Sequence, residues 1–282
     1  MMKNGVNSRL VKDKIFLSIV IFFSFLSILP LLFILFYIVK NGFGVLSLDF
    51  ITQLPKPVGE TGGGISNAII GTFILIGIAS ILSMPLGIGI GIYLAENKSG
   101  KLPYIVRLCA EVLQGIPSIV IGIIAWIWIV VQIGSFSALS GGIALGMLML
   151  PIIVRSTEET LKLIPTSLKE ASLALGVPYY RTILKVVLPT GISGIVTGIL
   201  LSISRVAGET APLLFTAFGS PYMNTNIMKP VNSLPALIFN YATSPYEDWL
   251  SAAWGASLVL VLLVLILNFI AKVVTKKWKV QF

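Results

Sequence analysis

The sequence predicts an all-α membrane protein: a polytopic bundle of six transmembrane helices with both ends of the chain on the cytoplasmic side. Two observations lead to this fold class. Of the 282 residues, 56% are hydrophobic and only 11% are charged, whereas a soluble domain contains about 25% charged residues. The Lys and Arg residues are also concentrated in alternate connections between long apolar runs.

Each predicted span is an apolar run close to the roughly 20 residues that cross a bilayer as a helix. The first run follows a basic N-tail, as in a signal peptide. However, it is longer than the apolar core of a signal peptide and no small-residue cleavage site follows it, so we expect it to be retained as a helix. The six predicted spans are residues 15–39, 66–94, 117–134, 138–155, 190–216 and 250–271.

The basic residues determine the predicted orientation. Sixteen of the 20 Lys and Arg residues fall in the N-tail, in the connections after the second and fourth spans, and in the C-tail. Lys40, Lys56 and Lys229 fall on the other side, and Arg205 lies inside a span. Because Lys and Arg are enriched in cytoplasmic loops, the side with sixteen is predicted to be cytoplasmic. This distribution accounts for the net charge of +9 without a nucleic-acid partner.

The composition excludes several kinds of chemistry. The chain has no His and one Cys, Cys109, so neither an internal disulfide nor a metal site built from His and Cys is expected. Ser193 lies in a G-I-S-G pattern but has no His to serve as its base. A Walker A loop, which would hold ATP phosphates, is missing as well. We therefore expect no enzyme activity and no cofactor, which leaves a transporter, a channel or an assembly factor.

Several local patterns predict details of the bundle. Pro117 is expected at the first position of a helix, or alternatively at a break whose free N–H groups line a path. Arg107 and Glu111 are read as a solvated i,i+4 pair. The outer connection 217–249 is expected to contact a partner or to lie on the membrane. Close helix contacts are indicated by three glycine pairs with four-residue spacing: Gly87 and Gly91, Gly142 and Gly146, Gly194 and Gly198.

The cytoplasmic connection 166–189 predicts two short helices, at 168–175 and 180–188. Ser167 and Glu170 fit a capping box at the start of the first helix, and Gly176 fits its end. A two-turn helix is not stable in water by itself, so its apolar face must pack against the bundle or enter a groove on a partner. That face consists of Leu168, Ala171, Ala174 and Leu175.

Arg205 and Glu209 are expected near the middle of the span 190–216, on one helix face. A charge at the bilayer centre is unfavourable by about 2.5–3.5 kcal/mol, and an i,i+4 pair returns only about 0.2–0.5 kcal/mol. A water-filled path for an anion therefore explains the two charges better than a structural ion pair does. Arg binds oxyanions with a bidentate fork, and Glu209 would assist release by competing for Arg205. Hydroxyl contacts are expected from Ser202, Ser204 and Thr210.

The segment 166–189 resembles the EAA signature of ABC importer permeases. The matching residues are Glu170-Ala171-Ser172, Gly176, Val186 and Leu188-Pro189, with the spacing of the family and mild changes at Ser172 and Val186. The resemblance implies that this segment docks into a cleft on a separate subunit that binds and hydrolyses ATP. The docking residues would be Glu170, Ala171, Ser172, Leu175 and Gly176.

The stretch RVAGETAPLLFTA, residues 205–217, is similar to the PstA-type permeases of phosphate importers, as are residues 62–72, 115–122 and 233–249. This resemblance implies a type I ABC importer permease fold in a bacterial or archaeal cell membrane, with a core at 62–272 between an N-terminal segment at 1–61 and a C-tail at 273–282. The implied partners are a PstC-type sister permease or a second copy of this chain, two ATP-binding subunits, an extracytoplasmic phosphate-binding protein and membrane lipid.

Two alternatives to a phosphate importer subunit stay open at this stage. One is a permease for another oxyanion such as sulfate or molybdate, because an Arg fork does not choose among oxyanions. The other is an ATP-independent anion transporter or channel. The segment 166–189 argues against that second alternative, since a self-sufficient channel needs no docking helix.

Overall fold

The computed structural model describes residues 2–57, 59–60 and 62–276 of the chain. Among these residues the regular elements are helices, apart from a single β-bridge between Phe218 and Val231. The all-α fold class is therefore confirmed. Of the predicted C-tail 273–282, residues 277–282 lie outside the described residues.

The elements follow one another as a series of long and short helices. They are α1 (Met2–Gly42), α2 (Leu48–Thr52), α3 (Ser66–Glu96), α4 (Lys101–Gly115), α5 (Ser118–Ala125), α6 (Val131–Ile133), α7 (Ala138–Lys162), α8 (Thr166–Ala174), α9 (Tyr179–Thr182), α10 (Leu188–Val206), α11 (Ala211–Thr216), α12 (Leu234–Ala242) and α13 (Glu247–Lys276). A 3₁₀ turn follows α1 at Phe43–Val45, and π-helical turns join α5 to α6 at Trp126–Val130 and α9 to α10 at Ile183–Val187.

Five stretches of the described chain are long and apolar enough to cross a membrane singly: Lys12–Val45, Ser66–Glu96, Ala138–Lys162, Tyr179–Val206 and Glu247–Ile270. A sixth crossing is obtained if the bent pair Lys101–Gly115 and Ser118–Ile133 counts as one span. The predicted set of six spans holds with that bent pair as the third member.

The third span, predicted at 117–134, is found as the arm Ser118–Ile133, and the helix before it, Lys101–Gly115, forms the other arm of the bent pair. The two arms of the bent pair meet at 105°, and Pro117 caps α5 from outside the helix instead of occupying its first position. The physical reason is that a residue before proline is driven out of the helical region. Ile116 accordingly has an extended backbone, with φ −72° and ψ 130°. The alternative of a break at Pro117 is confirmed.

Helix α7 lies at the centre of the bundle, and the glycine pairs bring its neighbours close. A Cβ added at Gly91 of α3 would lie 2.5 Å from Cβ of Thr157, and one added at Gly194 of α10 would lie 2.5 Å from side-chain atoms of Thr160. Gly142 of α7 itself meets Ile78 of α3 in the same way, at 2.4 Å. The close helix contacts predicted from the glycine spacing are confirmed.

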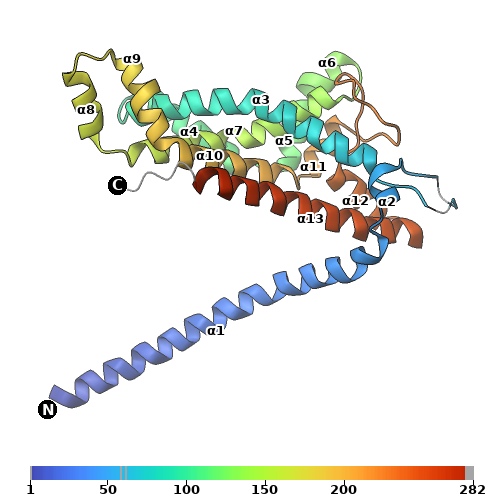
Figure 1. Cartoon of the computed structure of the whole chain (residues 1–282), viewed down its shortest axis with the longest axis horizontal. Helices are drawn as coiled ribbons and strands as arrows, with labels where there is room; N and C mark the ends of the chain where they lie inside the picture. The colour runs from blue at the N-terminus through green and yellow to red at the C-terminus, as the bar shows by residue number, and fades with distance from the viewer. Residues whose placement is uncertain (1, 58, 61, 277–282) are drawn as a thin grey trace.

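The two ends of the bundle differ as the predicted orientation requires. The start of α1, the end of α13 and the α8–α9 segment lie at one end in Figure 1, and α2 and α12 lie at the other. Helix α1 diverges from the remaining helices and approaches them only near its C-terminal end. Helix α12 is packed inside the outer end, where Leu234 and Leu237 are buried with Ile65 and Phe50. The expectation that the outer connection contacts a partner or lies on the membrane stays a prediction.

Candidate translocation site and coupling segment

The charged pair singled out in the sequence lies at a break in a membrane helix. Helix α10 ends at Val206 and α11 begins at Ala211, so residues 207–210 are not helical. The prediction of one continuous helix at 190–216 is therefore wrong. A proline within a helix removes a backbone hydrogen bond and clashes with the preceding turn. Pro212 avoids both by standing in the first turn of α11.

Arg205 and Glu209 remain close across this break. Arg205 is in the last turn of α10, Glu209 is in the non-helical segment, and their Nε and Oε1 atoms are 3.9 Å apart. The side chain of Arg205 is 46% exposed and that of Glu209 is 18% exposed. Within this chain the guanidinium is thus at a surface and not in a dry seam between helices.

The other predicted pathway residues have different surroundings. Thr210 is half-buried at the start of α11, and its carbonyl accepts hydrogen bonds from the N–H groups of Leu213 and Leu214. Ser202 is fully buried and donates its hydroxyl to the carbonyl of Ile199 one turn earlier, 2.6 Å away. In this structure Ser202 is thus engaged inside α10, whereas Arg205 is accessible.

Helix α5 supports the segment that follows the break. A Cβ added at Gly122 would lie only 2.6 Å from the Cα of Pro212, so the backbones of α5 and α11 are in direct contact. Because Pro212 follows Glu209 by three residues, this contact joins α5 to the chain next to the charged pair.

The coupling segment, residues 166–189, projects from the cytoplasmic end as α8 and α9 (Figure 1). Helix α8 begins at Thr166 after Pro165 and no side chain caps it, so the predicted capping box of Ser167 and Glu170 is wrong. Its C-terminal end is as expected: Gly176 has φ +75°, and the N–H groups of Gly176 and Val177 donate to the carbonyls of Leu173 and Ser172. This pair of bonds is the Schellman motif.

Four of the five predicted docking residues are exposed on the surface of the coupling segment. Glu170, Ala171 and Gly176 are exposed, and Leu175 is 84% exposed. Ser172 is buried, and its hydroxyl lies 2.9 Å from that of Thr182, which ties α8 to α9. A surface contact with a partner is therefore open to Leu175 and its exposed neighbours, while Ser172 holds the segment together.

The coupling segment is anchored to the end of α3 through Glu96. Lys169 of α8 and the phenol of Tyr179 both donate hydrogen bonds to the Glu96 carboxylate, one to each oxygen. Glu96 is far from the other two residues in the sequence, so no local pattern pointed to this contact.

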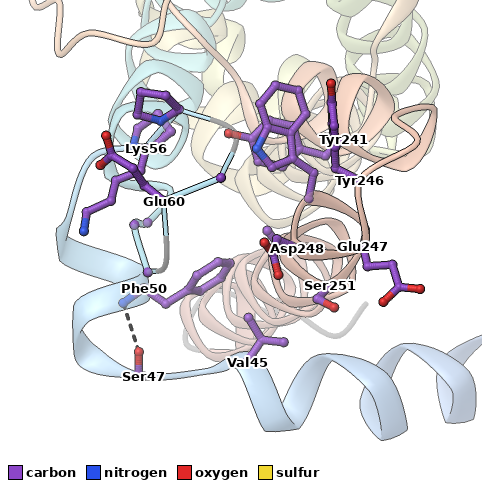
Figure 2. Close-up of a pocket in the computed structure, with 18 of the residues that line it drawn as sticks. Val45, Ser47, Phe50, Lys56, Glu60, Tyr241, Tyr246, Glu247, Asp248 and Ser251 are labelled. Atoms are coloured by element: carbon purple, nitrogen blue, oxygen red, sulfur yellow. Dashed lines mark hydrogen bonds between the residues drawn. The ribbon is translucent and has the colours of Figure 1, made fainter.

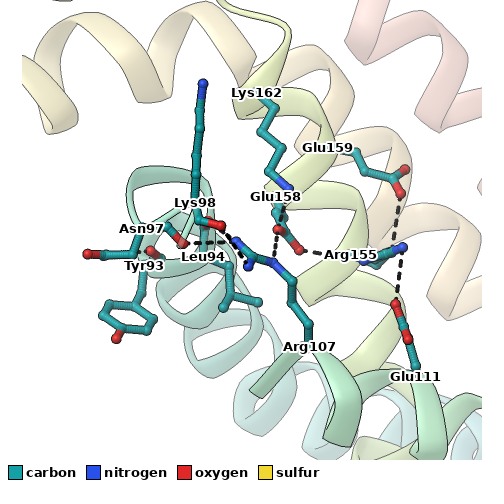
Figure 3. Close-up of polar contacts among 10 residues, drawn as sticks. All are labelled: Tyr93, Leu94, Asn97, Lys98, Arg107, Glu111, Arg155, Glu158, Glu159 and Lys162. Atoms are coloured by element: carbon teal, nitrogen blue, oxygen red, sulfur yellow. Dashed lines mark hydrogen bonds and ion pairs between the residues drawn. The ribbon is translucent and has the colours of Figure 1, made fainter. Parts of the chain in front are cut away.

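A second set of charges links α4 to α7 (Figure 3). Arg107 does not pair with Glu111 as predicted: its Nε donates to Glu158 of α7 at 2.6 Å, while Glu111 lies 3.4 Å from Arg155. The reason is that Glu158 is buried and the guanidinium stabilises it there, whereas the Glu111 side chain is more than half exposed. Sequence reasoning missed Glu158, although its i,i+4 spacing to Lys162, which also binds it, was a visible signal.

Comparison with known proteins places this arrangement in a family. Residues 87–280 match the family described as "Binding-protein-dependent transport system inner membrane component". This chain belongs to that family. The match spans the bent pair, both sides of the helix break and the whole coupling segment, so these features belong to a multi-pass membrane transport permease.

Curated relatives of this permease cover nearly its whole length. A phosphate transport system permease protein PstA from Yersinia pestis is 43% identical over 88% of this chain and 85% of its own. PstA from Haemophilus influenzae is 37% identical over 96% of this chain and 98% of its own. A probable PstA from Methanocaldococcus jannaschii is 37% identical over 91% of both.

Solved structures agree on the fold. The inward-facing MetNI methionine ABC transporter matches this permease with a TM-score of 0.62 at 20% identity, over 77% of this chain and 95% of the solved one. An amino acid ABC transporter matches with a TM-score of 0.53 at 14% identity, over 76% and 93%. This permease therefore has the fold of ABC importer permeases, as the sequence predicted.

At the outer end, the permease has a cavity of about 780 Å³ between the loop after α2 and the start of α13 (Figure 2). Its lining combines apolar and charged side chains, including Phe50, Lys56, Tyr241 and Asp248. Tyr241 stacks on Trp249 with ring centroids 4.6 Å apart. Burial raises the pKa of the Tyr241 phenol above its ordinary value. Among the described lining residues are neither Arg205 nor Glu209, so this cavity is separate from the helix break.

Proposed function

We propose that this chain is the permease subunit of an ATP-driven importer of inorganic phosphate. The observation that carries the proposal is the accessible guanidinium of Arg205 at a break in a membrane helix, beside Glu209 at 3.9 Å. The relatives named PstA, at 37–43% identity over most of the chain, support phosphate as the cargo.

The chemistry of the break suits an anion that must be bound and then released. A guanidinium offers two parallel N–H donors to a phosphate oxyanion. A transport site must also let its cargo go. At 3.9 Å the Arg205–Glu209 contact is longer than a charge-assisted hydrogen bond of about 2.7–2.9 Å. The Arg205 guanidinium can therefore turn from Glu209 to a phosphate, and Glu209 can pair with Arg205 again when the phosphate leaves.

Energy for transport would enter through the coupling segment. We assign ATP binding and hydrolysis to two partner subunits, each receiving a segment like 166–189 in a cleft, with Leu175 as an exposed apolar contact. The translocation path would form between this chain and a PstC-type sister or a second copy of itself. A phosphate-binding protein would deliver its cargo at the outer end, where α2, α12 and the cavity of Figure 2 lie.

The test is uptake of labelled phosphate into liposomes that contain the complete complex, with and without ATP. Uptake that needs ATP and is not suppressed by excess sulfate or molybdate is expected. ATP-independent uptake would favour a channel, and suppression by sulfate or molybdate would point to a different oxyanion as the cargo.

The role of Arg205 is tested by Arg205→Gln in the same assay. Loss of a charge-assisted contact of about 1.5–3 kcal/mol corresponds to a reduction in uptake of at least about tenfold. The matched control is Lys40→Gln, which removes one positive charge from the exposed end of α1, outside the break. Unchanged uptake by the assembled Arg205→Gln complex contradicts the assigned role.

A further inference from the structure

The last turn of α3 is held from two sides by groups that belong to different helices. On one side, Glu96 accepts from Lys169 and Tyr179 of the coupling segment. On the other side, the carbonyls of the neighbouring residues accept from the guanidinium of Arg107 in α4. Those acceptors are Leu94 at 2.7 Å, Asn97 at 2.9 Å and Lys98 at 3.3 Å.

Arg107 extends this junction to α7 (Figure 3). Its Nε donates to Glu158 at 2.6 Å, and the Glu158 side chain is only 1% exposed. A charge-assisted bond between such groups is short and directional. Without Arg107, the buried Glu158 carboxylate would keep its contacts with Lys162 and, at 3.9 Å, with Arg155, but it would lose its bond to α4. Because the bond is short, a displacement of either helix strains it, which suits a contact that passes movement from one helix to another.

Helix α4 depends on this pair for its position. Of its residues, Pro103 and Ala110 are buried, and Ala110 packs with Leu94 and Val154 in a small apolar cluster directly beside the pair. Val106 and Leu113 are partly buried against the bundle. Other apolar side chains of α4 are exposed: Leu102, Tyr104, Ile105, Leu108 and Val112.

Polar contacts therefore contribute much of the directional attachment of α4. Glu111 and Gln114 join α4 to α7 alone, through Arg155 and the carbonyl of Pro151. Arg107 joins α4 to both α3 and α7.

The position of α4 in turn sets that of the charged helix break. Helix α4 continues through the 105° bend into α5, and Gly122 of α5 touches the backbone of Pro212 just after the break. A continuous set of contacts therefore runs from α8 through the end of α3 to α4, α5 and α11.

We propose that Arg107 and Glu158 are a positioning pair that carries the movement of the coupling segment to the Arg205–Glu209 break. When the segment 166–189 moves, Glu96 moves with it, and the Arg107 clamp on the same turn of α3 passes the displacement to α4 and α5. The proposal rests on the proposed function, since it requires an ATP-driven partner at α8.

The test compares ATP consumed with phosphate imported in the reconstituted complex. Arg107→Gln and Glu158→Gln are expected to leave ATP hydrolysis nearly unchanged while raising the ATP-to-phosphate ratio about 2- to 30-fold, the range seen for residues that carry coupling between sites. The double variant should raise the ratio by less than the product of the two single effects, because the two changes share one contact while each also removes contacts of its own.

The matched control is Glu159→Gln on the same helix. Glu159 pairs with Arg155 of its own helix at 3.2 Å, and its side chain is 64% exposed. Its ATP-to-phosphate ratio should equal that of the unmodified complex. A ratio that rises equally for Glu159→Gln would overturn the proposal, because the effect would then follow from any lost charge on α7.

Two further outcomes are decisive. If hydrolysis and uptake fall in proportion in Arg107→Gln and Glu158→Gln, the pair is only structural. If those variants fail to assemble, Glu96→Gln tests the other half of the junction at a more accessible pair, and an unchanged ratio there overturns the proposal. Failure of the proposed function is distinguished by the unmodified complex itself, which would then import no phosphate with ATP.

Discussion

The contact between α10 and α7 at Gly198 allows a prediction worked from geometry. A Cβ added at Gly198 would lie 1.9 Å from Oγ and 2.3 Å from Cβ of Ser156. Carbon atoms in contact need about 3.5–4.0 Å, so Gly198→Ala is short of space by about 1.2–1.7 Å. Rotation of the Ser156 side chain relieves only the Oγ contact, because its Cβ is fixed to the backbone of α7. The helices must therefore separate.

Gly77→Ala on α3 is the matched control, since an added Cβ there meets nothing within 4 Å. Both variants gain the same helix preference of Ala over Gly, about 0.5–1 kcal/mol, so their difference isolates the clash. Forced overpacking costs about 1–3 kcal/mol, and each kcal/mol lowers a melting temperature by about 2–4 °C in proteins of comparable size.

Thermal unfolding of the purified chain in detergent measures this difference. Gly198→Ala should melt about 2–12 °C below Gly77→Ala, and adding Ser156→Gly, which removes the opposing Cβ, should recover most of the loss. Equal melting temperatures for Gly198→Ala and Gly77→Ala would refute the close approach of α10 to α7.

Two predictions concern the outer end and the orientation. Thr72→Val removes the buried hydroxyl that accepts a hydrogen bond from the first backbone N–H of α12 at 2.9 Å. The N–H left without an acceptor should destabilise the chain by about 1–3 kcal/mol, measured as a lower melting temperature. An unchanged melting temperature would disprove that contact. In a Cys109→Ser background, a membrane-impermeant maleimide should label Thr225→Cys only from outside the cell and Ser99→Cys only from the cytoplasmic side, and the opposite pattern would reverse the assigned orientation.

Apolar length and charge distribution were enough to predict the crossings and their orientation, because a bilayer imposes both directly. The two helix breaks were harder to predict: the one after Val206 was taken as part of a single span, and the one at Pro117 was one of two alternatives. Pro117 and Pro212 were the available signals, but a proline in a membrane helix is tolerated in many settings. Whether it interrupts the helix depends on its surroundings, since Pro85 and Pro151 lie inside α3 and α7 and both helices continue past them.

Of the charged contacts, one between residues close in the sequence was predicted, and one between different helices was not. Arg205 and Glu209 are close in the sequence, and their proximity was predicted correctly, whereas their place on a pathway stays a prediction. Arg107 was assigned to its sequence neighbour Glu111, while its partner Glu158 lies 51 residues away. Local spacing rules describe one helix at a time, so a pair that joins two helices is visible only once the fold is known.

Helix α1 stands apart from the rest of the permease. Its membrane-length stretch is the most apolar of the spans, yet none of its best window is buried inside the molecule, and it meets α13 where Gly42 leaves no room for a Cβ beside the carbonyl oxygen of Trp254, 2.7 Å away. The bilayer thus acts on this segment as solvent, and its backbone hydrogen bonds are satisfied within the helix alone. Nearly any apolar side chain serves equally well along it, and the requirement for one specific residue is confined to the point where the helix joins its neighbours.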